Sequence, residues 1–307
     1  MRPTALALLL LALAGPARPD CAGIVLPLMD GADGQPRIAV GLPDGARRFV
    51  LDTGAPVSVL RESVVAELGL AHQPINLDAV AGATGRAFQE RVVVPQVVLG
   101  GAVFDDVGFL IQPRSHAANA DMAGLIGADL FARYDLELDY ARHRIVLLPQ
   151  GACRPPGMAA LTVEIRRSRH VLVPLVADGQ RIAGLLDTGA AESLMKMDAA
   201  HRFFGVDPAE AQRLPAGLVA GADGGQMPAY LYGLRTLALG PVTLDRPHLL
   251  LITDQTRERH PLVAGAPDAE TGLPDFVLGM SALRRLHLIV AYGEGRLYVA
   301  EAARGAG

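Results

Sequence analysis

The feature that most constrains this chain is an internal repeat, in which each half carries the tripeptide Asp-Thr-Gly. The tripeptide begins at Asp52 and again at Asp187, an offset of 135 residues (187 − 52). Further blocks return in the same order: Ala79–Ala83 as Leu218–Ala222, Val97–Gly100 as Leu237–Gly240, and Gly124–Leu130 as Phe276–Ala282. A duplicated sequence predicts two structurally similar units.

The length of the chain fits two units. Its 307 residues exceed a usual domain of about 100–200 residues, and 50% hydrophobic against 20% charged residues allows sizeable cores. We place a first lobe at 20–150, a linker rich in Pro and Gly at 151–160, a second lobe at 161–302 and a tail at 303–307. The second copy is longer because of a polar stretch between about 254 and 275, which predicts a surface loop.

Short segments rich in β-branched residues predict an all-β chain. The strands expected in the first half are 91–94, 97–99, 103–104, 108–111, 136–140 and 144–148. Short helices are expected after each Asp-Thr-Gly, at 61–68 and 196–204, and after each apolar-apolar-Gly, at 129–134 and 281–286.

The N-terminus has the pattern of a signal peptide. A basic start is followed by the apolar run Ala5–Ala14 and by small residues and prolines, so we assign residues 1–19 to a cleaved signal peptide. The protein is then periplasmic or secreted. In an oxidising compartment Cys21 and Cys153 could form a disulfide, but the sequence gives no distance between them.

Two matched Asp-Thr-Gly motifs carry more information than one. A single copy is common in ordinary turns, whereas each copy here follows an apolar strand, precedes an alanine and leads to an apolar-apolar-Gly segment. The paired motifs therefore predict one site built from both halves.

In these residues the chain resembles the pepsin and retropepsin clan of aspartic peptidases, and within it the bacterial retropepsin-like members. The resemblance implies a bilobal pepsin-like architecture of two duplicated retropepsin-type β-barrel lobes with a cleft between them. It implies that Asp52 and Asp187 are the catalytic pair. The supporting loop residues are Thr53, Gly54, Thr188 and Gly189.

The chemistry explains why two copies are needed. Two carboxyls a few Å apart share one proton, so that one accepts a proton from water while the other donates to the scissile carbonyl. The expected substrate is a polypeptide in extended conformation. Because both motifs lie in one chain, we expect a monomer.

The cover of the cleft is less clear. The candidate flap contains Gly82, Thr84, Gly85 and Phe88 but lacks the tyrosine of pepsin-like flaps, and Phe88 either caps the site or packs in the core. Tyr230 and Tyr232 follow the equivalent glycines of the second half, so either lobe could supply the cover. Glu192 either lines a subsite or is a solvated acid at a helix start.

The sequence disfavours several other classes of protein. The 8 histidines are scattered and no zinc motif occurs, so we expect no metal and no cofactor. A net charge of −4 without a basic cluster disfavours nucleic acid as a partner, and no segment after the N-terminus suits stable membrane insertion.

The predicted function is an exported aspartic endopeptidase. One alternative is a catalytically inactive peptide-binding module on the same fold. Another is an exported β-sandwich that binds carbohydrate or mediates adhesion, but it would leave the matched Asp-Thr-Gly loops unexplained.

Overall fold

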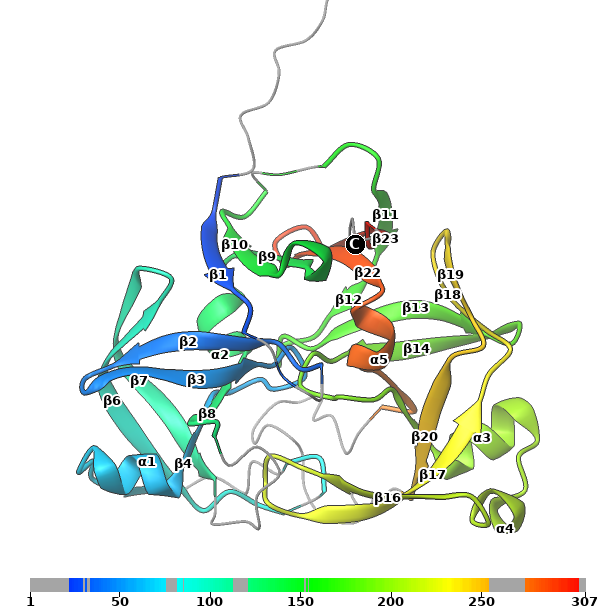
Figure 1. Cartoon of the computed structure of the whole chain (residues 1–307), viewed down its shortest axis with the longest axis horizontal. Helices are drawn as coiled ribbons and strands as arrows, with labels where there is room; N and C mark the ends of the chain where they lie inside the picture. Colours follow the sequence, from blue (N-terminus) through cyan, green and yellow to red (C-terminus); the bar gives the residue numbers. More distant parts are fainter. Residues whose placement is uncertain are drawn as a thin grey trace, which may run out of the picture.

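The computed structural model describes residues 22–29, 31, 34–75, 82–84, 86–112, 121–151, 153, 155–253 and 274–303. The expected signal peptide, Cys21, Gly85, residues 254–273 of the expected surface loop and residues 304–307 lie outside the described residues. Figure 1 shows two lobes side by side with a third sheet above them, which confirms the bilobal, mainly β fold.

The first lobe is a closed barrel. Its strands run in the order β2 (Arg37–Leu42), β3 (Gly45–Leu51), β8 (Gly124–Ile126), β4 (Val59–Arg61), β7 (Ala102–Gln112) and β6 (Glu90–Leu99), with β5 (Gln73–Pro74) added to β6. Pairing of β2 with both β3 and β6 closes the ring, so the barrel has no free edge within these six strands.

The second lobe repeats this plan with interrupted strands. Its sheet runs in the order β16 (Pro215–Ala220), β17 (Gln226–Gly233), β20 (His248–Ile252), β15 (Leu194–Lys196), β21 (Phe276–Leu278), β14 (Gln180–Leu186), β13 (Val171–Ala177), β18 (Thr236–Leu239) and β19 (Val242–Asp245), with β12 (Glu164–Ile165) paired to β13. The segments β17 and β18 together occupy the place of β6.

The same strand crossing lies at the centre of each lobe. In the first, β3 is parallel to β8, β8 is antiparallel to β4, and β4 is parallel to β7. In the second, β14, β21, β15 and β20 pair in the same way. The sequence repeat is therefore a repeat of topology.

A six-stranded sheet joins the two halves. Its order is β1 (Ile24–Pro27), β10 (Arg144–Leu148), β9 (Asp135–Asp139), β22 (Leu286–Ala291), β23 (Arg296–Glu301) and β11 (Ala159–Thr162), three strands from each half. The seam is the antiparallel pair β9 and β22, with Leu138 opposite Leu288. This shared sheet was not predicted from the sequence, and β11 begins inside the expected linker.

The helices are short and cover the outside of the sheets. They are α1 (Glu62–Glu67), α2 (Ala128–Phe131), a 3₁₀ turn η1 (Tyr140–Arg142), α3 (Met197–Phe204), α4 (Pro208–Ala211) and α5 (Met280–Leu283). Four of them lie where the sequence predicted helices, and α4 and η1 were not expected. Among the described residues, no helix is long and apolar enough to cross a bilayer.

The expected division of β6 and β7 into shorter strands is wrong. Both run continuously, and the pairing passes from Val94 opposite Val107 to Gln96 opposite Asp105. Between these pairs Pro95 lies across from Asp106, whose φ is 51°. Proline has no N–H to donate, so this local irregularity accommodates it without ending the strand.

Cys153 is buried and disulfide-bonded. The only other cysteine of the chain, Cys21, lies outside the described residues, so the pairing expected from the sequence stays a prediction.

Candidate active site

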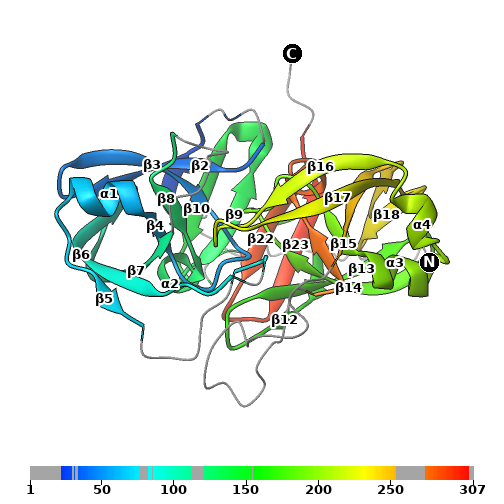
Figure 2. The ribbon, with the colours of Figure 1, turned by 90° about the horizontal axis from the view of Figure 1, so that it is seen from below.

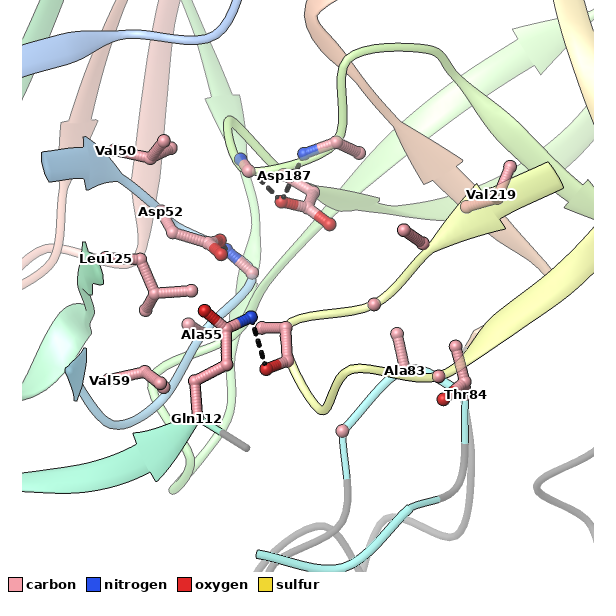
Figure 3. Close-up of a pocket in the computed structure, with 18 of the residues that line it drawn as sticks. Val50, Asp52, Ala55, Val59, Ala83, Thr84, Gln112, Leu125, Asp187 and Val219 are labelled. Carbon is pink, nitrogen blue, oxygen red and sulfur yellow. Dashed lines mark hydrogen bonds between the residues drawn. The ribbon is translucent and has the colours of Figure 1, made fainter. Parts of the chain in front are cut away.

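Strand periodicity directs both aspartates to the cleft. Side chains of a strand alternate between its two faces. In β3, Leu51 is fully buried in the main core, whereas Val50 lines the cavity between the lobes. Asp52 follows two residues after Val50 and also faces the cavity. The same alternation in β14 places Asp187 there, and Figure 3 shows the two carboxyls side by side.

Each loop is fixed by the threonine of the other lobe. The Thr53 hydroxyl donates to the Leu186 carbonyl at 2.8 Å and accepts from the Thr188 amide at 3.0 Å. Thr188 reciprocates, donating to the Leu51 carbonyl at 2.6 Å and accepting from the Thr53 amide at 3.0 Å. Both threonines are fully buried, so four satisfied hydrogen bonds tie the lobes together beneath the carboxyls.

The glycines allow the two loops to approach each other. A Cβ atom at Gly54 would collide with the carboxyl of Asp187, and one at Gly189 would collide with that of Asp52. The Gly54 and Gly189 amides also donate to the Oδ1 atoms of Asp52 and Asp187, each at 2.8 Å. Glycine at these positions therefore holds its own aspartate and makes room for the opposite one.

The apolar-apolar-Gly segments support the loops from below. The Asp52 amide donates to the Ile126 carbonyl at 2.9 Å, and the Asp187 amide donates to Leu278 at 3.0 Å. A side chain at Gly127 would meet the backbone of residues 55–58, and one at Gly279 would meet that of residues 190–192. The repeated motif is thus required by close backbone contact with the loop above it.

The two carboxyls have different surroundings. Burial, the adjacent charge of Asp187 and a hydrogen bond to Asp187 together hold the pKa of Asp52 well above its usual value. Burial also raises the pKa of Asp187, but the hydrogen bond from Asp52, the amides of Gly189 and Ala190, and nearby His170 oppose that rise. The shared proton therefore resides on Asp52, and Asp187 is the carboxylate.

A cavity of about 960 Å³ lies above the pair, between two apolar walls. The first-lobe wall consists of Val50, Val59, Phe88, Leu110, Met122 and Leu125. The second-lobe wall consists of Leu185, Leu194, Val219, Leu250 and Val277. Charged side chains lie among the lining residues on both sides, with Arg61 and Arg86 from the first lobe and the exposed Glu192 from the second.

The flap segment, residues 82–88, meets the tip of the β16–β17 hairpin over the cavity. The buried carboxylate of Asp223, in that tip, accepts from the Thr84 amide at 3.0 Å, the Thr84 hydroxyl at 2.7 Å and the Arg86 amide at 3.2 Å. Gln112 in β7 donates to the Ala222 carbonyl at 2.9 Å, as Figure 3 shows. The hairpin reaches toward the first lobe in Figure 2, so both lobes contribute to the cover.

The aromatic residues considered for the cover have other places. Phe88 is 5% exposed and packs in the first-lobe wall, where it lines the cavity. Tyr230 packs against the core and Tyr232 stacks on Phe204, and neither lines the cavity. The expectation that a second-lobe tyrosine covers the cleft is therefore wrong, because these side chains point to the body of the lobe.

Several polar residues of the site were missed by sequence reasoning. Asp223, Gln112, Gln35 and His170 contact the loops or the cover, yet each is a single polar residue without a local motif. Position within the repeat was the one available signal, since Gln35 and His170 are also 135 residues apart (170 − 35).

A group of possible metal ligands occurs in the shared sheet. The ligand atoms of Glu137, Asp139 and His287 lie within 4.8 Å of one another. His287 Nε2 is 2.8 Å from Glu137, Arg142 donates to Asp139 at 2.7 Å, and Arg144 lies within 4.0 Å of both acids. These cations balance the carboxylates, so the cluster is explained as an ion-pair network.

Comparison with known proteins supports the resemblance seen in the motifs. The family model for aspartyl protease matches residues 40–130 and 173–282. These segments contain both Asp-Thr-Gly loops and both apolar-apolar-Gly segments. A search of curated proteins found no match. Since the family model covers more than half of the chain and one copy falls in each lobe, the chain belongs to the aspartyl protease family.

Proposed function

We propose that this protein is an exported aspartic endopeptidase in which Asp52 and Asp187 activate water together. The observation that carries the proposal is the pair of half-buried carboxyls sharing a proton at the floor of an apolar-walled cavity. Holding two acids together is costly in free energy, and four buried hydrogen bonds maintain the loops that do so.

The mechanism follows from the different protonation of the two acids. Asp187, as the carboxylate, takes a proton from a water molecule held between the carboxyls, while Asp52 donates its proton to the carbonyl oxygen of the scissile amide. The water oxygen bonds to the carbonyl carbon and a tetrahedral diol forms. Transfer of a proton to the amide nitrogen then breaks the C–N bond without a covalent enzyme intermediate.

The cavity supports an extended substrate with apolar side chains on either side of the cut bond. The two walls flank the dyad, and a strand-like peptide places successive side chains on opposite faces. The exposed Glu192 favours a basic substrate residue on the second-lobe side. These features suit a polypeptide substrate.

Export is proposed from the N-terminal pattern and from the disulfide-bonded Cys153, because disulfides persist in oxidising compartments. The mature protein would then act in the periplasm or outside the cell.

The test is digestion of a diverse peptide library by the wild-type protein and by Asp187→Asn at several acid pH values, with products identified by mass spectrometry. We expect cleavage by the wild type alone, with apolar residues flanking the cut. Equal product patterns from the two proteins would overturn the proposal. Binding of peptides by both proteins without cleavage would favour an inactive peptide-binding module.

A further inference from the structure

One polar side chain from each lobe reaches the Asp-Thr-Gly loop of the other lobe. Gln35, just before β2, donates through Nε2 to the Gly189 carbonyl. His170, just before β13, lies with Nε2 at 2.9 Å from the Gly54 carbonyl. Since the two residues are separated by the same offset as the two aspartates, they occupy equivalent positions, one neutral and one titratable.

The contacts of His170 fix its ring orientation and tautomer. A carbonyl oxygen can only accept, so Nε2 carries a hydrogen. The Ser168 hydroxyl lies 3.1 Å from Nδ1 and can donate to it or accept from it. His170 is 4% exposed, and both protonation states keep the same two partners. The ring can therefore gain a proton without moving.

The charges around His170 are unequal with respect to the two aspartates. A positive imidazolium favours the ionised form of Asp187 and lowers the pKa of that carboxyl against the effect of burial. For Asp52, the causes that raise the pKa are burial and Asp187 itself.

The other charged groups near the turn do not supply this asymmetry. Arg169 donates to the Ala128 carbonyl at 3.0 Å, at the start of the helix that carries Asp129. The Arg166 amide donates to the His170 carbonyl at 2.9 Å, and its guanidinium pairs with Glu164. His170 is thus the residue of this turn that acts on Asp187.

We infer that His170 is a positioning residue that makes the two aspartates inequivalent, holding the loop of Asp52 and, when positively charged, keeping Asp187 as the carboxylate. The inference rests on the proposed hydrolytic function. It assigns Asp187 as the base that receives the water proton and Asp52 as the acid that protonates the carbonyl. Gln35 supplies the same loop contact without a charge.

The first experiment uses His170→Gln, which places at this position the residue that its own counterpart carries. Glutamine can donate to the Gly54 carbonyl but does not titrate. Without the positive charge Asp187 takes up a proton more readily, so the acid limb of the kcat/KM profile should move to higher pH. On that limb we expect a several-fold loss of kcat/KM, with little change at the plateau. Gln35→Ala is the control, and should lower kcat at all pH values without moving the limb.

The second experiment does not depend on proteolysis. The imidazole of His170 is followed by NMR through its ring C–H resonance, assigned by its loss in His170→Gln, in the wild type and in Asp187→Asn. Removal of the facing carboxylate should shift the titration of His170 to lower pH. A His170 titration that is unchanged in Asp187→Asn, or a pH profile of His170→Gln that superimposes on the wild type, would overturn the inference. Absence of any cleavage by the wild type, with the NMR shift present, would instead refute the proposed function alone.

Discussion

Each threonine of the two Asp-Thr-Gly loops serves the opposite lobe rather than its own aspartate. Thr53 and Thr188 are fully buried and exchange hydrogen bonds through both their hydroxyls and their amides. A sequence motif identifies these residues, because the repeat marks them. Their partners across the interface, the carbonyls of Leu51 and Leu186, follow only from the three-dimensional arrangement.

Replacing Thr53 with valine should destabilise the protein markedly. Valine keeps the shape but leaves the Leu186 carbonyl and the Thr188 amide without their partner, at a cost of about 2–4 kcal/mol in the free energy of unfolding. Thr53→Ser keeps the hydroxyl and should cost about 1 kcal/mol. Urea denaturation followed by circular dichroism measures both. Equal losses for the two variants would show that the hydroxyl contributes little.

The raised pKa of Asp52 makes stability depend on pH. The folded protein retains a proton that the unfolded chain releases above about pH 4. The folded state therefore binds more protons in this range, and the free energy of unfolding falls as the pH rises, until the folded carboxyl ionises. Asp52→Asn should show a smaller fall between about pH 4 and neutral pH than the wild type. The same pH dependence in both proteins would contradict the assignment of the proton to Asp52.

At the scale of elements, the repeat predicted the order of strands and four of the helices. The sequence could not predict how β16–β17 meets the flap segment, because that contact depends on the single buried residue Asp223 at a hairpin tip. It could not predict the continuous β6 either, since Pro95 normally indicates a strand end and only its pairing partner accommodates it.

Removing the Asp223 carboxylate should loosen the cover of the cavity. In Asp223→Ala the amides of Thr84 and Arg86 lose their acceptor, so their hydrogen exchange should become faster while that of Asp52, bonded to Ile126, stays the same. Asp245→Ala, which removes an exposed carboxylate from the β18–β19 hairpin, is the matched control. Unchanged exchange at Thr84 and Arg86 would show that Asp223 does not hold the cover closed.

At the scale of the whole molecule, the two lobes share both the Asp-Thr-Gly loops and the six-stranded sheet. Paired motifs in one chain predicted that the halves meet at one site. The shared sheet escaped prediction because β9 and β22 are ordinary strands, and nothing local in their sequences shows that they pair with each other. Long-range pairing of this kind depends on topology rather than on local sequence.

A chain that holds both aspartates has no need of a partner subunit. Specific activity should therefore stay constant when the protein is diluted from micromolar to nanomolar concentration, and sedimentation should show a monomer throughout. Activity per mole that falls on dilution together with a change in sedimentation would indicate an obligate dimer.

The central claim, that Asp52 and Asp187 form one hydrolytic unit, is tested most directly by a double-mutant cycle. The values of kcat/KM for one cleaved peptide are compared among the wild type, Asp52→Asn, Asp187→Asn and the double variant, with folding checked by circular dichroism. We predict a loss of about 10²–10⁴-fold for each single variant and no further loss for the double variant, because residues that act as a unit are not additive. Near-normal turnover in either single variant, or losses that multiply in the double variant, would contradict a single shared site.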